Sequence, residues 1–115
     1  MIYLASPYSD SDPEVREQRF EKVCQAAAGL VRAGHIVFSP IAHGHSISKF
    51  GLPTGWKDWE KSDRAFLVRC DEVAVLTLDG WDESEGVREE IRIAKEIEKP
   101  VQYVSPSNLE FTEIP

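Results

Sequence analysis

The stretch EVAVLTLDGWDESEGVREEIRIAKEIEKPVQYV, residues 72–104, decides the fold. It opens with an apolar run over 72–78 that is typical of a buried strand, and it closes with a second such run over 100–104. Between them, residues 85–97 repeat apolar side chains at helical spacing. A strand, a helix and a strand in this order usually form a crossover unit whose two strands lie parallel. The stretch therefore predicts an α/β protein.

The N-terminal part of the chain shows the same alternation. Residues 1–5 predict a first buried strand, and residues 35–38 predict a second. The helix between them has a start signal in which Ser11 can serve as the cap. Gly34 ends this helix, since glycine adopts the left-handed conformation that often follows a helix.

The remaining segments complete one domain over residues 1–115. A helix is predicted over 55–69, a long loop over 39–54 and a C-terminal tail over 105–115. Strands that alternate with helices predict a three-layer fold, in which helices cover both faces of a parallel sheet. We expect a flavodoxin-like or Rossmann-like arrangement, with the ligand at the carboxyl ends of the strands.

Composition limits the classes of partner. The formal net charge is −7, from 13 Lys and Arg against 20 Asp and Glu, and a chain of this charge repels phosphate backbones. We expect a small-molecule partner and no polymeric nucleic acid. Neither a signal-peptide pattern nor an apolar stretch of roughly 18–20 residues is visible, so we expect a cytoplasmic protein without a membrane partner. Cys24 and Cys70 form no zinc-type spacing, and neither a metal nor a cofactor is expected.

Two carboxylates stand on apolar faces of predicted helices. At about 100° per residue, Glu90 lies roughly 40° from Gly86, inside the apolar arc, whereas Glu89 points with the charged face. Asp63 lies roughly 40° from Trp59 in the apolar stripe of the preceding helix. A carboxylate on such a face is costly unless it is paired, hydrogen-bonded or protonated. Either acid alone can be a satisfied structural group, but two on consecutive helices favour a cleft for glycosidic bond chemistry.

The segment Ser84–Ala94, SEGVREEIRIA, resembles the helix-start motif of the nucleoside 2-deoxyribosyltransferase family, which also contains 2′-deoxynucleoside 5′-monophosphate N-glycosidases. The nucleophilic glutamate of that motif falls on Glu90. Asp63 matches a second family position, because it stands eight residues before Asp71 at the start of the third strand. Tyr3 in the opening strand matches the tyrosine that helps to position the nucleophile. The resemblance covers nearly the whole chain.

This resemblance implies cleavage or transfer of the N-glycosidic bond of a nucleoside, a deoxynucleoside or its 5′-monophosphate. Glu90 would form a covalent glycosyl ester, Asp63 would bind the sugar or protonate the departing base, and Tyr3 would hold the Glu90 carboxylate. Ser84 would favour a 5′-phosphate, since its hydroxyl and the free N–H groups of a helix start accept an anion. Ser84 can also be merely an N-cap.

The carboxyl ends of the strands supply most of the other candidates. The predicted substrate-binding residues are Ser84, Gly86, Ser6, Pro7, Tyr8, Trp81, His43 and Arg19. Trp81 is expected in the pocket wall and Trp59 in the core. His43 and His45 are both candidates for contact with a base, and Arg19 either supplies charge for a phosphate or lies on a solvated face.

Other function classes are weaker, and one remains open. A non-catalytic nucleotide-binding or sensing module would use the same pocket, and it is favoured if Glu90 or Asp63 is paired with a cation and inaccessible. A phosphoacceptor receiver domain needs an acidic pair after the first strand, where Ser6-Pro7-Tyr8 stands instead. A dinucleotide-binding unit needs GxGxxG after Ala5, and that motif is absent.

The tail leads to an expectation about assembly. Leu109 and Phe111 have no obvious place in the core of their own domain. We therefore expect a homodimer or larger homo-oligomer in which the tail covers a neighbouring copy.

Overall fold

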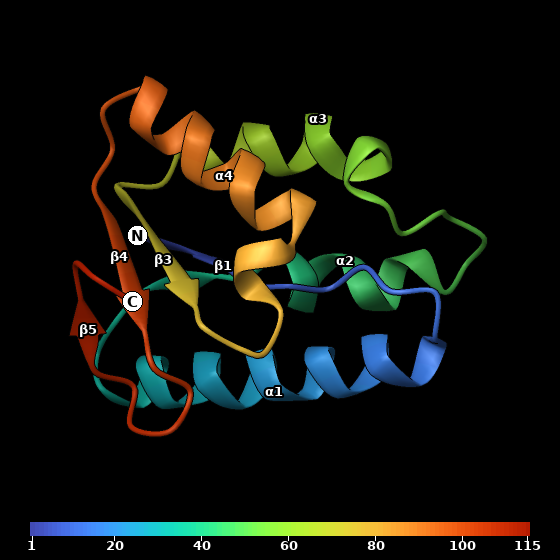
Figure 1. Cartoon of the computed structure of the whole chain (residues 1–115), viewed down its shortest axis with the longest axis horizontal. Coiled ribbons are helices and arrows are strands. Elements are labelled where there is room, and N and C mark those ends of the chain that lie inside the picture. The colour runs from blue at the N-terminus through green and yellow to red at the C-terminus, as the bar shows by residue number, and fades with distance from the viewer.

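The computed structural model describes residues 1–115, and its sheet has five strands in the order β2-β1-β3-β4-β5 (Figure 1). The strands are β1 (Ile2–Ala5), β2 (Val37–Phe38), β3 (Glu72–Leu76), β4 (Val101–Val104) and β5 (Phe111–Thr112). The first four are parallel, and β5 runs antiparallel to β4. The predicted fold class is confirmed: the chain is a single α/β domain with a flavodoxin-like or Rossmann-like arrangement.

Helices cover both faces of this sheet (Figure 1). One face carries α1 (Pro13–Arg32), and the other carries α3 (Trp56–Leu67) and α4 (Glu85–Glu96). The remaining helix, α2 (Pro40–Ser48), contacts α1 and β1. None of the four helices is long and apolar enough to cross a membrane.

The alternation of side chains along β1 divides the core in two. Ile2 and Leu4 belong to the cluster beneath α1, whereas Tyr3 and Ala5 belong to the cluster beneath α3 and α4. Tyr3 is fully buried as a result, and its ring is directed toward the helices that carry the two unusual acids.

The N-cap of α4 is the residue that the sequence predicts, whereas the N-cap of α1 is a different residue. Ser84 caps α4, and its Oγ accepts a hydrogen bond from the N–H of Val87 at 3.2 Å. The cap of α1 is Asp12 and not Ser11: its carboxylate accepts from the N–H of Glu14 at 2.9 Å. Pro13 is the physical reason, because proline favours the first helical position and the residue before it then becomes the cap.

The prediction of a long loop over residues 39–54 is wrong, since α2 occupies most of that segment. Ser39 caps this helix by accepting from the N–H of Ala42 at 3.0 Å, and Pro40 follows at the first position. Gly44 weakens the helical propensity of the segment. Packing against Trp59 compensates for this loss. The helix lies so close to the indole that a Cβ at Gly44 would be only 3.4 Å from the ring.

The tail also has a place in its own domain, contrary to the prediction. Phe111 pairs with Val104 across the antiparallel β4–β5 ladder. Leu109 and Phe111 both pack against the core cluster beneath α1. The tail therefore gives no support for an oligomer, and the expectation of a homodimer or larger assembly stays a prediction.

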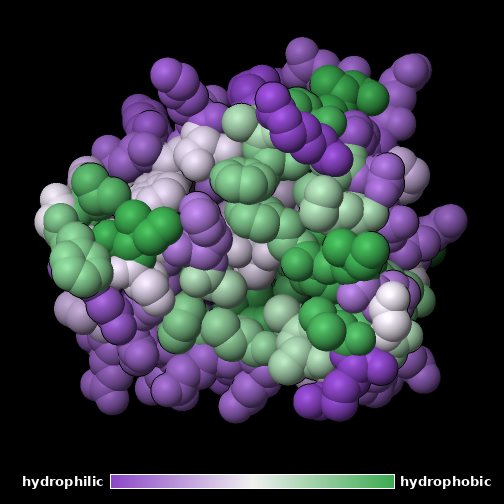
Figure 2. Space-filling view, turned by 180° about the vertical axis from the view of Figure 1, so that it is seen from behind, coloured by the Kyte–Doolittle hydropathy of each residue, from purple (hydrophilic) through white to green (hydrophobic).

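Other apolar side chains do reach the surface. The most exposed is Phe50, at 90%, and Ile36, Ile47, Leu52 and Phe66 are also exposed. The face behind that of Figure 1 shows wide apolar areas between the polar side chains (Figure 2).

We expect Leu109→Ala to lower the free energy of unfolding by about 1–3 kcal/mol, because it removes a side chain that packs on α1 within the same chain. Ile114→Ala is the control, since Ile114 is 76% exposed and its truncation should change little. Denaturant unfolding at two protein concentrations is the measurement. A loss of stability that disappears on dilution would show that Leu109 acts between copies of the chain.

Candidate functional site

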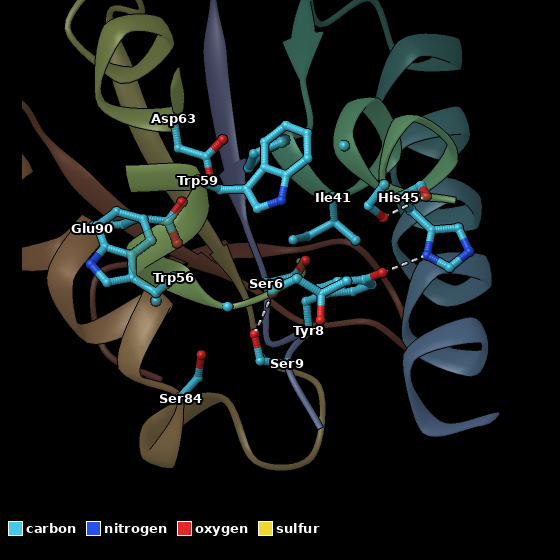
Figure 3. A pocket seen from close by; sticks show the side chains of 16 residues that line it. Ser6, Tyr8, Ser9, Ile41, His45, Trp56, Trp59, Asp63, Ser84 and Glu90 are labelled. Carbon is cyan, nitrogen blue, oxygen red and sulfur yellow. Dashed lines mark hydrogen bonds between the residues drawn. The ribbon is translucent and has the colours of Figure 1, made fainter. Parts of the chain in front are cut away.

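A pocket with about 510 Å³ of empty space opens beyond the carboxyl end of β1 (Figure 3). The chain passes from β1 to β2 on one side of β1 and then from β2 to β3 on the other side, and parallel sheets bind their ligands at such a switch point. The lining comes from the β1–α1 loop, α2, the start of α3 and the first turns of α4.

Glu90 lines one wall of the pocket, and its buried partner Tyr3 lies outside the lining. Glu90 is only 4% exposed, and its Oε2 accepts a hydrogen bond from the Tyr3 hydroxyl. Burial among apolar side chains and the charge of Glu90 hold the pKa of Tyr3 well above its ordinary value, so Tyr3 remains the donor. Glu89 lies on the outer face of α4 and pairs with Arg92 at 2.9 Å. The prediction that Glu90, and not Glu89, points inward is confirmed.

Asp63 lines the same pocket from α3 and is 8% exposed. Neither Asp63 nor Glu90 forms an ion pair with a cationic side chain. Burial therefore raises the pKa of Asp63 to about 7. Burial also raises the pKa of Glu90 to about 8, the Tyr3 hydrogen bond opposes this rise, and the nearby charge of Asp63 adds to it. The structure thus brings all three predicted catalytic residues to one place.

The first turn of α4 forms the next part of the wall. Ser84 and Gly86 both line the pocket, together with the half-buried ring of Trp56 (Figure 3). The N–H groups at the start of α4 have no partners within the helix, apart from the one that Ser84 caps. This corner of the pocket therefore suits a negatively charged or hydrogen-bond-accepting group.

Ser6 contributes a polar atom without a partner. Its side chain is 4% exposed and lines the pocket, and its Oγ makes no hydrogen bond. A buried hydroxyl without a partner is unusual, since nearly all such groups are satisfied. A polar ligand atom in the pocket would supply the hydrogen-bond partner that the Ser6 hydroxyl lacks.

The side of the pocket across from Glu90 carries Tyr8 and His45 (Figure 3). The Tyr8 hydroxyl lies 2.7 Å from Nδ1 of His45, and Nε2 of His45 lies 2.7 Å from Oε2 of Glu17. Ser9 ties the β1–α1 loop to the opposite rim by donating to the carbonyl of Thr54 at 2.9 Å. This side thus carries a chain of hydrogen bonds from the pocket to the half-exposed Glu17.

Two of the three tryptophans exchange their expected places. Trp59 lines the pocket, and its Nε1 donates to the carbonyl of Pro53 at 2.8 Å, which fixes the indole. Trp81 lies outside the lining, because its ring packs edge-on against Tyr103 at 5.4 Å. A helix that begins at Trp56 turns Trp59 toward the cavity, whereas the short 3₁₀ turn Trp81–Glu83 turns Trp81 toward the sheet.

Three further predicted contact residues also lie outside the lining. His43 is exposed on α2 beside the ring of Phe38, and Pro7 is fully buried below the loop. Arg19 donates to the backbone carbonyls of Tyr8 and Ser9 at 3.3 and 3.1 Å. Arg19 therefore holds the loop that lines the pocket and does not itself reach into it.

Sequence reasoning missed the wall that α2 provides. Ile41, Gly44, His45 and Ser48 all line the pocket, and their spacing places them on one face of a helix. The signal was present in the sequence, but it has meaning only if residues 40–48 are a helix. His43 then points away, and His45 is the histidine that lines the pocket.

Residues 1–105 match a family described as a domain of unknown function, DUF1937. The chain belongs to this family. No curated protein matches the chain. The DUF1937 match does not connect the chain to the nucleoside 2-deoxyribosyltransferase family, so that resemblance stays a prediction from the motifs.

The raised pKa of Glu90 predicts how stability changes with pH. The folded protein binds this proton more tightly than the unfolded chain does, so stability is lost as the pH rises from about 4.5 to about 8. Glu90→Gln removes the charge and should raise the Tm at pH 9 by about 4 °C or more, with little effect at pH 5. Glu89→Gln is the control, since its Arg92 partner lowers the pKa of Glu89. Thermal unfolding across pH 5–9 that shows the same shift at every pH would contradict the assignment.

Proposed function

We propose that this DUF1937 chain is an enzyme that cleaves or transfers the N-glycosidic bond of a deoxynucleoside or its 5′-monophosphate. The observation that carries the proposal is the buried Glu90 carboxyl, held by Tyr3 and facing a pocket that a second buried acid, Asp63, also lines. Paired carboxyls with shifted pKa values at one cleft are the usual groups of glycosidic bond chemistry. The motif resemblance in Ser84–Ala94 points to the same reaction.

In the proposed reaction Glu90 attacks the anomeric carbon of the sugar and forms a glycosyl ester. The ester is then released by water or by a second base. Tyr3 supports this role, because its hydrogen bond favours the ionised form of Glu90 and fixes the orientation of the carboxyl. Asp63 binds a sugar hydroxyl or donates a proton to the departing base.

The proton balance of the two acids gives the site a resting state. Burial raises the pKa of both acids, so without a ligand the pair holds a proton more readily than exposed carboxyls do, and this proton belongs to both. Positive charge that develops on a sugar next to Glu90 would favour its ionised form and leave the proton on Asp63. The nucleophile is then formed in response to the substrate.

Ser84 and the start of α4 support a 5′-monophosphate as the substrate. Ser84 and Gly86 line the pocket at the first turn of α4, where N–H groups lack partners within the helix, and Gly86 adds no side chain to that corner. A phosphate is favoured at such a position by both the hydrogen bonds and the helix dipole.

A non-catalytic binding module is the second candidate. It would explain the acids as structural groups paired with cations and closed off from ligands. Glu90 instead contacts a neutral tyrosine, and both acids line the pocket. These contacts favour the enzyme.

We expect Glu90→Gln to abolish base release, because it removes the nucleophile while keeping the size of the side chain. Glu89→Gln, one residue away on the outer face, should retain most of the activity. Asp63→Asn should lower the rate by about 10²-fold or more if Asp63 transfers a proton. Products from a panel of deoxynucleosides and their monophosphates are measured by mass spectrometry. Undiminished activity in Glu90→Gln would overturn the proposal in favour of the binding module.

Ser84→Asp tests the phosphate separately. A carboxylate at the start of α4 repels the 5′-phosphate, so kcat/KM should fall far more for monophosphates than for free deoxynucleosides. Aspartate also caps helices well, which keeps α4 intact. An equal loss on both kinds of substrate would remove the phosphate from the proposal but leave the glycosidic reaction in place.

A further inference from the structure

A partly buried chain of hydrogen bonds lies across the pocket from Glu90 and links the pocket to solvent (Figure 3). Tyr8 lines the pocket and contacts His45, and His45 contacts Glu17, with 2.7 Å at each step. The His45 side chain is 7% exposed, whereas that of Glu17 is 47% exposed. The proposed reaction, as described so far, assigns no role to these three residues.

The carboxylate of Glu17 determines what the rest of the chain can do. It accepts from the Nε2–H of His45, so Nδ1 of a neutral imidazole carries no proton and accepts from the Tyr8 hydroxyl. A protonated imidazole donates from Nδ1 instead, and the Tyr8 O–H is then free to point into the pocket. Protonation of His45 therefore changes Tyr8 from a donor toward His45 into an acceptor from His45, and the Tyr8 O–H becomes a donor toward the pocket.

The surroundings of this chain suit the transfer of a proton. Phe20 stacks on the imidazole at 4.1 Å, and both ring nitrogens have hydrogen-bond partners, so the ring is held in one orientation. The charged groups that face Tyr8 are Arg16 and Glu17, both from α1. Glu17 stabilises an imidazolium at His45, and Arg16 stabilises the Tyr8 oxygen as its proton leaves.

We propose that Glu17, His45 and Tyr8 form the general-acid chain that protonates the departing base. The inference rests on the proposed function. When Glu90 attacks the anomeric carbon from one side, the base leaves from the other, and Tyr8 stands on that other side (Figure 3). Asp63, which lies on the same side of the pocket as Glu90, then binds a sugar hydroxyl.

The step balances in atoms and electrons. A Glu90 oxygen forms a bond to the anomeric carbon, the carbon–nitrogen bond breaks, and its electron pair goes to the base. The base takes the Tyr8 proton, and Tyr8 takes the Nδ1 proton of His45, which leaves a neutral imidazole bound to Glu17. The water that later attacks the glycosyl ester loses a proton, and this proton returns along the chain to His45.

The test compares leaving groups that need a proton with leaving groups that do not. The probes are dGMP against its N7-methyl form, whose base departs without protonation, and dTMP against 5-fluoro-dUMP, whose base is more acidic. The variants are Tyr8→Phe, His45→Gln and Glu17→Gln. Their controls are His43→Gln, from the exposed side of α2, and Glu21→Gln, one turn further along α1 and exposed.

We expect Tyr8→Phe and His45→Gln to lower kcat/KM by about 10²-fold for the poorer leaving group of each pair and far less for the better one. Glu17→Gln should act in the same direction, and both controls should match the wild type. Tyr8→Phe keeps the aromatic ring, so it remains informative if His45→Gln fails to fold. An equal loss on both members of a pair would show a structural role and overturn the general-acid chain alone. If the wild type releases no base from any probe, the proposed function fails, and this inference fails with it.

Discussion

The hydrogen bond from Tyr3 to Glu90 is the interaction on which the site depends. It joins the interior strand β1 to α4 inside the core, where an unpartnered carboxyl would be costly. Three local features place its two ends. The alternation of β1 turns Tyr3 toward α4, Ser84 sets where α4 begins, and the 3.6-residue period then turns Glu90 inward.

The pocket built around this contact has two chemically different sides. Glu90, Asp63 and the start of α4 supply acids and N–H donors beside the rings of Trp56 and Trp59. On the other side, Tyr8 and His45 supply a hydrogen-bonded path to solvent. A molecule that fits both sides carries an anionic or hydroxyl-rich part joined to a flat ring. In the proposed reaction the sugar would lie beside the two acids, and its bond to the base would lie next to Glu90.

The sequence predicts the structure correctly where apolar side chains repeat with a clear helical or strand period. The amphipathic pattern of residues 85–97 distinguishes Glu90 from Glu89, and the strand–helix alternation predicts the parallel sheet. Prediction from the sequence fails where tertiary packing overrides the local preference of residues such as glycine and proline. Gly44 and Pro40 suggested a loop, yet the packing of Trp59 sustains a helix there. The two-residue strand β5 is too short to leave a pattern of its own, which is why Phe111 was misplaced.

The most direct test of the central claim is peptide mapping by mass spectrometry after rapid acid quenching of the protein during turnover of a deoxynucleoside 5′-monophosphate. The account predicts a sugar-phosphate adduct on the peptide that contains Glu90, located on that residue by fragmentation and absent from Glu90→Gln. Base release without any adduct in the wild type, together with undiminished release by Glu90→Gln, would contradict it.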